Sequence, residues 1–402
     1  MVIDRLGAGF LGPYGNTWLD TPQFNRLASQ SVLFESALAD APELALAYRA
    51  WWTGRHALEP AMDSRLALPQ SAREAGLRTV LVTDDPLVAE LPDSSFFAER
   101  KFLPAPPVTR AANELDETGL GKLFLTAIET LRRGTEPALV WIHSRGMAGP
   151  WDAPSVLRQQ FADEDDPVAP EFVDPPRHFA HQDSDPDELL GYVHAYAGQV
   201  ALADACLGSL LDALDESPPA GTTLLAMTSP RGYPLGEHGR IGPADEALYS
   251  ELLHVPLLVR LPDGAGALAR TQRLVQPGDL FATLAEWLHL PPAPESGFAK
   301  SLLPIAQGED LPPRELAVST APAHGAVRSP AWLLLTAIVD DEVYRKLFAK
   351  PDDRWEVNEV SSRCGDIAEQ LAAAAEQFRQ AAAAGTLASL PPLAEVLTDS
   401  RR

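Results

Sequence analysis

Charged residues closely follow two apolar runs of this 402-residue chain. Asp4 and Arg5 come after residues 1–3, and Arg231 comes after the run 222–229. If both runs are strands of a parallel sheet, their carboxyl ends lie at the edge where α/β proteins bind ligands. Arginine forks at that edge would suit a sulfate or a phosphate group. The residues that we consider as candidates for binding such a ligand are Asp4, Arg5, Arg49, Arg231 and His238.

Asp4 also has a simpler explanation. A carboxylate buried at a strand end is costly unless an opposite charge compensates it. We therefore predict that the guanidinium group of Arg5 or Arg231 lies against Asp4. A structure with both guanidinium groups directed into solvent would exclude this pairing. His238 is expected to support its own loop through hydrogen bonds.

Other polar groups are better explained without a ligand. Asp84 and Asp85 end an apolar run just before Pro86, which is ordinary turn chemistry. His143 lies inside another apolar run, so we expect it in the core.

Two sets of residues keep alternative explanations. An H-x-x-H pattern could bind a transition metal, but its acidic, Pro-rich surroundings favour a solvated loop; its residues are His178 and His181, beside Asp183 and Asp185. Three tryptophans could belong to the core or form a platform for a sugar ring, and these are Trp51, Trp52 and Trp151.

Short apolar runs alternate with helical stretches, which predicts an α/β fold with a largely parallel central sheet flanked by helices. The clearest helix is 192–216, and a helix beginning at Pro22 has Thr21 as its N-cap. The expected strands, apolar nearly throughout and therefore buried on both faces, are 78–85, 138–144, 222–229 and 254–261.

We predict two domains. The α/β domain spans 1–315, and 151–189 forms a long acidic, Pro-rich surface loop within it. Residues 316–402 form a small α+β subdomain with short antiparallel strands and an Ala-rich helix at 367–385.

The composition excludes some partners. A net charge of −24 repels nucleic acid and anionic membranes. The apolar runs stop short of the roughly 20 residues of a membrane-spanning helix, so we predict no such span. Cys206 and Cys364 are too few and too far apart for a disulfide framework. Residues 1–3 are short for a strand, so we expect the natural chain to begin upstream, and the compartment stays undetermined.

Several segments resemble the sulfatase family of the alkaline phosphatase superfamily, in the family's order and over nearly the whole chain. The resemblance therefore implies the fold of that family. The segments are IDRLGAGFLGPYGN, TPQFNRLASQSVLFESALA, TGRH, LGEHG, LYSELLHVPLLVRLP, and LPP with SLLP.

The resemblance also implies a cation site that this chain has lost. Sulfatases use a divalent cation, Ca²⁺ or Mg²⁺, which needs clustered oxygen ligands. The family has two adjacent Asp residues after the first strand and an Asp-His or Asp-Asn pair after a later one. Here the first pair reads Asp4-Arg5 and the second Pro230-Arg231. Proline and arginine side chains do not ligate cations, so we predict that no cofactor is bound.

The nucleophile of the family is replaced too. Sulfatases attack the ester with a formylglycine made from the Cys or Ser of a C/S-x-P-S-R signature. Aligned on the motif TGR, that position is Leu44, with Tyr48 in place of the signature arginine; one deletion moves them to Ala45 and Arg49. The other replaced positions are Ala148, where the family has a histidine, and Pro243, where it has a lysine.

We therefore predict a sulfatase-like protein without sulfatase activity, with a role in binding or regulation. Its partner would be a sulfated or phosphorylated small molecule or glycan, or an active relative with which it assembles. The alternative is a hydrolase of sulfate or phosphate esters without formylglycine, using Asp4, His143 and His238. A third interpretation is a decaying gene product without a selected function.

Overall fold

The structure of the protein is a computed structural model. It describes residues 1–60, 67–105, 107–134, 136–179, 185–216, 221–243, 246, 248–291 and 298–399. The chain divides into two compact units, each made of segments distant in sequence. The first contains residues 1–33, 72–244 and 255–270, and the second contains 34–71, 245–254 and 271–402. The two are described separately.

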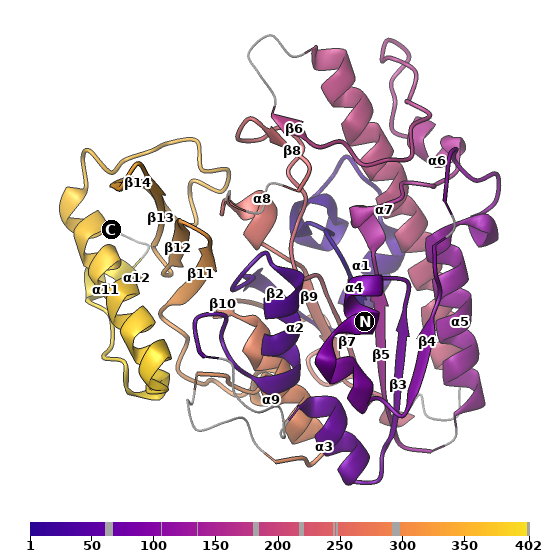
Figure 1. Ribbon diagram of the computed structural model, residues 1–402, viewed down its shortest axis with the longest axis horizontal. Helices are drawn as coiled ribbons and strands as arrows, with labels where there is room; N and C mark the ends of the chain where they lie inside the picture. Colours follow the sequence, from indigo (N-terminus) through magenta and orange to yellow (C-terminus); the bar gives the residue numbers. More distant parts are fainter. Residues whose placement is uncertain are drawn as a thin grey trace. The chain divides into compact units, whose positions relative to one another are not determined.

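The first unit is built on a mostly parallel sheet (Figure 1). β1, β3, β4, β5 and β7 are parallel, whereas β9 runs antiparallel to both β7 and β2. Within this unit the strand order is β9-β7-β1-β5-β3-β4, and the first two residues of β2, Val32 and Leu33, pair with β9. Their bounds are β1 Val2–Ile3, β2 Val32–Ala37, β3 Arg78–Thr83, β4 Glu99–Phe102, β5 Ala138–Ser144, β7 Leu225–Thr228 and β9 Leu257–Arg260. The predicted α/β class with a largely parallel sheet is confirmed.

Helices flank this sheet. Leu123 and Phe124 of α5 share a buried cluster with Val80, Val82 and Ile142 of the sheet. The helices are η1 Ala8–Phe10, η2 Gly12–Tyr14, α1 Pro22–Ser29, α4 Pro86–Glu90, η3 Pro92–Phe96, η4 Leu115–Glu117, α5 Gly119–Arg133, η5 Gly146–Ala148, α6 Ser155–Gln159 and α7 Pro186–Asp215. The residues of α3, Leu68–Glu74, are divided between the two units. A separate antiparallel pair consists of β6 His178–Phe179 and β8 Arg240–Ile241.

α7 is longer than predicted and apolar enough, by length and composition, to cross a membrane. However, 83% of the apolar window of this helix is buried inside the protein, so it is weak evidence for a membrane span. Burial therefore accounts for its apolar composition.

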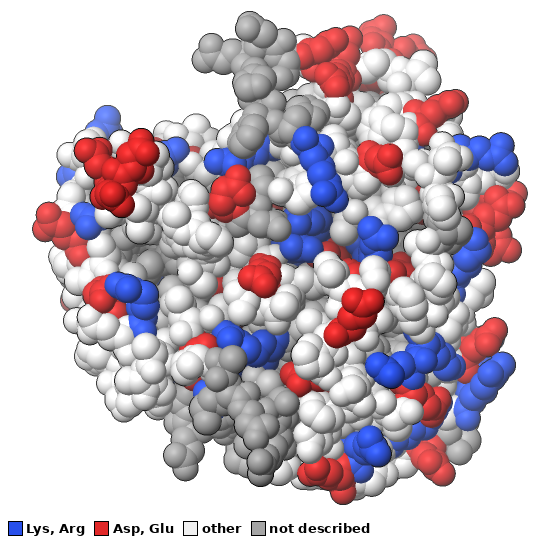
Figure 2. Space-filling model, viewed as in Figure 1, with Lys and Arg blue, Asp and Glu red and all other residues white. Residues whose placement is uncertain are grey.

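Figure 2 shows basic side chains interspersed among acidic ones on the face that it draws, so the net charge of −24 is not concentrated there in one acidic surface.

The start of α1 shows how α7 positions a neighbour. Thr21 is the N-cap, as predicted, but its hydroxyl accepts a hydrogen bond from the Gly12 N–H rather than from the helix. The free N–H groups of the first turn, those of Gln23 and Phe24, donate to Asp204 of α7 instead. A carboxylate from another helix thus satisfies donors that a local cap normally satisfies.

The stretch 151–189 is only partly the surface loop that we predicted. It contains α6 and β6, and α7 begins within it. Arg158 of α6 is buried and donates to the carbonyl oxygens of Trp151, Pro170 and Phe172 at 2.5–2.7 Å. One guanidinium group therefore holds distant parts of this irregular stretch together.

The second unit contains an antiparallel sheet of four strands in the order β11-β12-β13-β14. Its strands are β11 Ala317–Ala321, β12 His324–Arg328, β13 Trp332–Val339 and β14 Glu342–Ala349, and β10 covers Arg270–Val275. The helices are α2 Leu44–Thr53, α8 Ser250–Leu253, α9 Pro277–Trp287, α10 Leu303–Ala306, α11 Gly365–Ala384, η7 Leu387–Ser389 and α12 Glu395–Thr398. The predicted antiparallel strands and Ala-rich helix are present, and α11 covers one face of the sheet. The compact unit also takes in earlier segments, so the boundary at 315 stays a prediction.

Candidate functional site at the ends of the parallel strands

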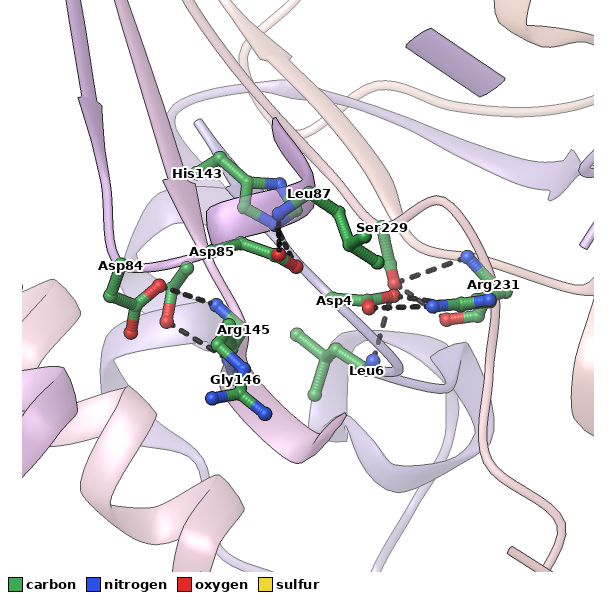
Figure 3. Close-up of polar contacts among 11 residues, drawn as sticks. Asp4, Leu6, Asp84, Asp85, Leu87, His143, Arg145, Gly146, Ser229 and Arg231 are labelled. Carbon is green, nitrogen blue, oxygen red and sulfur yellow. Dashed lines mark hydrogen bonds and ion pairs between the residues drawn. The ribbon is translucent and has the colours of Figure 1, made fainter. Parts of the chain in front are cut away.

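Asp4 follows β1 and forms a two-point ion pair with Arg231, which follows β7 (Figure 3). The Nε of Arg231 donates to Oδ1 of Asp4 at 3.1 Å, and its Nη2 donates to Oδ2 at 3.0 Å. Asp4 is fully buried and Arg231 is 9% exposed. The predicted pairing of Asp4 with an arginine is therefore present, and Arg231 forms it.

The electrostatics of Asp4 follow from this geometry. Burial alone would raise the pKa of the carboxyl group, because it removes the charged form from water. The charge and hydrogen bonds of Arg231 act in the opposite direction, with smaller effects from Arg5 and His143. The net result is a pKa below the usual value, so Asp4 is an anion stabilised by arginine.

The backbone around the pair is held by two hydroxyl groups. The Ser229 hydroxyl accepts from the Leu6 N–H and donates to the Arg231 carbonyl. The Tyr196 hydroxyl of α7 donates to the carbonyl of Arg5 and accepts from Gly7. Arg5 itself is buried, with a φ of 59° in the left-handed region. The turn after β1 is thus fixed from two sides.

A second polar group lies at the ends of β3 and β5, which are adjacent in the sheet. The Nε2 of His143 lies 3.5 Å from Oδ2 of Asp85, and Oδ1 of Asp85 caps α4 by accepting from Leu87. Asp84 accepts from the Arg145 N–H at 2.8 Å. His143 is fully buried, as predicted, but its contact with Asp85 was not foreseen (Figure 3).

Asp84 is expected to make stability depend on pH. Burial raises its pKa from 3.8 to about 6, so the folded state holds the proton more tightly than the unfolded chain. Stability from this group is full below the unfolded pKa and falls as pH rises through about 6. Asp84→Asn keeps the acceptor for Arg145, so it should raise the free energy of unfolding by about 3 kcal/mol near pH 8 and by little near pH 4. Urea unfolding at both pH values tests this; an equal change at both would refute it.

The residues predicted at the nucleophile position belong to α2 of the second unit. Leu44 and Ala45 open this helix, and Tyr48 packs edge-on against Trp51 and Trp52. Arg49 donates to the carbonyl oxygens of His56 and Ala57 at 3.0 and 2.7 Å. These bonds hold the chain that follows α2, so Arg49 is engaged within its own unit rather than presented to a ligand.

The remaining predicted positions lie in turns and loops. His238 is half-buried in the turn before β8, Ala148 ends η5, and Pro243 follows β8. His181, Asp183 and the side chain of His178 lie outside the described residues, and Asp185 caps α7. The three tryptophans, Trp51, Trp52 and Trp151, are at most 2% exposed and belong to the core.

Comparison with known proteins agrees with the fold. The family model described as Sulfatase matches residues 1–290. Human arylsulfatase D is 39% identical over 80 residues, which are 19% of this chain and 14% of that protein. Human iduronate 2-sulfatase is 36% identical over 74 residues, or 18% and 13%. The matched segments therefore span less than a fifth of these relatives.

Solved structures match over almost the whole chain. The phosphonate monoester hydrolase of Agrobacterium radiobacter has a TM-score of 0.74 at 19% identity, over 100% of this chain and 98% of that one. BT4656, solved with its substrate D-glucosamine-2-N,6-O-disulfate, has a TM-score of 0.78 at 15% identity, over 95% and 97%. At these identities the likeness concerns the fold.

Proposed function

Because the chain belongs to the sulfatase family, we propose that it keeps the fold of that family, hydrolyses no sulfate ester, and acts in binding or regulation. The observation that carries this proposal is the buried ion pair of Asp4 and Arg231 at the strand ends. In this proposal an internal guanidinium group takes over the charge balance that a divalent cation would supply.

The residues around Asp4 do not fit Ca²⁺ or Mg²⁺. These ions need several oxygen ligands, whereas both oxygens of Asp4 already accept from Arg231. The neighbouring positions are Arg5, a second cation, and Pro230, which has no side-chain donor atom. In the part of the chain that the structure describes, no three His, Cys, Asp or Glu side chains are grouped to hold a metal. A cation would meet positive charge here.

The proposed loss of chemistry has a second support, in α2. Leu44 and Ala45, the alternative positions of the formylglycine precursor, are aliphatic, and Leu44 is buried. Neither side chain can attack sulfur or phosphorus. Loss of the nucleophile and of the cation ligands together leaves no route through the chemistry of the family.

One observation favours the alternative, a hydrolase without formylglycine. The contact of His143 with Asp85 resembles the pairing of a general base with an orienting carboxylate. His143 is fully buried, however, so a substrate could reach it only if the strand ends opened. We therefore prefer the inactive protein and use turnover to separate the two proposals.

The decisive experiment measures turnover of aryl sulfate, phosphate and phosphonate esters by the purified protein, with and without Ca²⁺ and Mg²⁺. We expect rates equal to those of the variants Asp4→Ala and His143→Ala, because no nucleophile or cation site remains. Turnover above that level that is lost in both variants would overturn the proposal and establish the alternative.

The binding role is tested separately by calorimetry with sulfated and unsulfated sugars. One solved relative binds a disulfated glucosamine, which suggests sulfated or phosphorylated glycans as the ligand class. Arg231→Met keeps much of the side-chain volume and removes the charge. If sulfated sugars bind equally to the parent and to this variant, the ligand does not use the strand ends. Absence of binding to both would favour assembly with an active relative.

A further inference from the structure

β14 is the last strand of the antiparallel sheet in the second unit, and half of its outer edge is covered. At Leu347 the N–H donates to the Glu359 carboxylate, and the carbonyl accepts from Val360. The backbone of Leu347 therefore points away from β13. By the alternation of an antiparallel ladder, the backbone groups of Val343 and Arg345 point the same way. Among the described residues, no strand pairs with them.

The end of the β13–β14 hairpin is apolar on both faces. Ile338 and Val343 are paired across the strands, on the face that α11 covers further along at Leu334 and Leu347. These two side chains are 52% and 57% exposed.

The opposite face has the same character. Val339 and Tyr344 are 50% and 54% exposed, whereas Leu335 and Phe348 on that face are buried. On each face of the sheet, exposed apolar surface thus extends beyond the residues that other elements bury. Such exposed apolar surface commonly marks an interaction site.

Charge along β14 is divided between its ends. Asp340, Asp341 and Glu342 lie at the turn, and Arg345 and Lys346 follow within the strand. An antiparallel partner with the same sequence would bring the acidic end of one strand to the basic end of the other. The edge is therefore complementary to itself, as a two-fold interface requires.

The backbone directions select one register. The backbone N–H and C=O groups of Val343 and Arg345 both point outward. Both residues can form hydrogen bonds with the second copy if Val343 of one copy pairs with Arg345 of the other. Tyr344 then meets Tyr344 of the second copy on the two-fold axis, as a pair without hydrogen bonds. Glu342 meets Lys346 of the second copy. Aromatic and opposite-charge pairs across strands are stabilising.

We propose that β14 pairs antiparallel with β14 of a second copy in this register, joining two sheets of four strands across a two-fold axis. Each chain contributes the outward N–H and C=O of Val343 and Arg345. The exposed side chains of Val343 and Tyr344 become buried between the two strands. This dimer is independent of whether the strand ends in the first unit carry any chemistry.

Cross-linking tests the register. In the full chain carrying Cys364→Ser, Tyr344→Cys places two thiols on the two-fold axis, where paired Cα atoms lie about 4.5 Å apart, within disulfide range. We expect a disulfide-linked dimer under mild oxidation. The matched control Glu342→Cys faces Lys346 rather than itself and should stay largely uncross-linked. Equal cross-linking of both variants, or of neither, would overturn the proposed register.

Analytical ultracentrifugation of the protein without introduced cysteines tests whether the dimer forms. Val343→Pro removes an outward N–H and leaves the β13 ladder intact, so it should shift the chain to monomer. Glu342→Lys and Lys346→Glu should each weaken the dimer about tenfold, and combining them should restore it. Circular dichroism confirms folding of each variant. A parent that stays monomeric across the micromolar range, or a dimer that these changes leave unaltered, would refute the proposal.

Discussion

Arg231→Ala is expected to lower the free energy of unfolding by about 3 kcal/mol near neutral pH, because it leaves the buried carboxylate of Asp4 without its partner. The two hydrogen bonds of 3.1 and 3.0 Å are lost together with the charge. Urea unfolding of the parent and the variant gives the difference directly.

The pH dependence identifies the mechanism. Arg231 holds the pKa of Asp4 below its usual value, so this group contributes stability above the unfolded pKa that is lost as pH falls through the folded pKa. Without Arg231, burial acts largely unopposed and raises the pKa. The variant can then bind a proton in the folded state. The difference in the free energy of unfolding between parent and variant should therefore become smaller as pH falls toward 4.

A matched control is Arg26, which also contacts carboxylates at two points but at the surface. It bonds Asp212 and Asp215 at 2.7 and 2.9 Å, and it is 31% exposed. Arg26→Ala should cost at most about 1 kcal/mol because solvent screens exposed pairs. The double variant Asp4→Leu with Arg231→Met removes both charges and should recover most of the stability. Equal costs for Arg26→Ala and Arg231→Ala would contradict a buried, desolvated pair.

Strands and long helices were predictable because their apolar patterns are local. β5 coincides with the run 138–144, β3 covers most of the run 78–85, and residues 192–216 fall almost entirely in α7. The direction of β9 was not predictable from its own residues. An apolar run such as 254–261 suits either orientation, and only pairing with β2 and β7 decides it.

The candidate site was predictable where one residue requires another. A buried Asp4 needs a positive partner, and the sequence offered Arg5 and Arg231 at suitable strand ends. The contact of Asp85 with His143 has no such local signal. It depends on β3 and β5 being neighbours with Thr83 opposite His143, which sequence distance does not reveal. The sequence indicated only that Asp85 and His143 each lie near the end of a strand.

The local structure of the stretch 151–189 is hard to predict because composition describes only the average residue. Asp and Pro are frequent in the segment, yet the arginine of α6 is buried and binds three of its backbone carbonyls. A guanidinium group can bind several backbone carbonyls at once, which supplies order without an apolar pattern. Composition alone could not identify which arginine is buried.

Restoring the ligand types of the family should create a cation site. The triple variant combines Arg5→Asp, Pro230→Asp and Arg231→His. It replaces two arginines and a proline near Asp4 with side chains that can ligate a cation. Arg5 has a φ of 59°, which aspartate tolerates better than most residues. We expect the triple variant to bind Ca²⁺ with a Kd on the order of 10⁻⁴ to 10⁻³ M, as in weak extracellular sites.

Calorimetry and thermal unfolding with Ca²⁺ measure this gain. Ca²⁺ at tenfold its Kd should stabilise the triple variant by about 1.4 kcal/mol, whereas the parent should not respond. The neutral control, Arg5→Asn, Pro230→Asn and Arg231→Gln combined, removes the same charges without adding carboxylates. Its failure to bind would show that carboxylates, rather than loss of arginine, create the site. Calcium affinity of the parent equal to that of the triple variant would mean that the pair of Asp4 and Arg231 does not exclude a cation, and the proposed inactivity would lose its main physical reason.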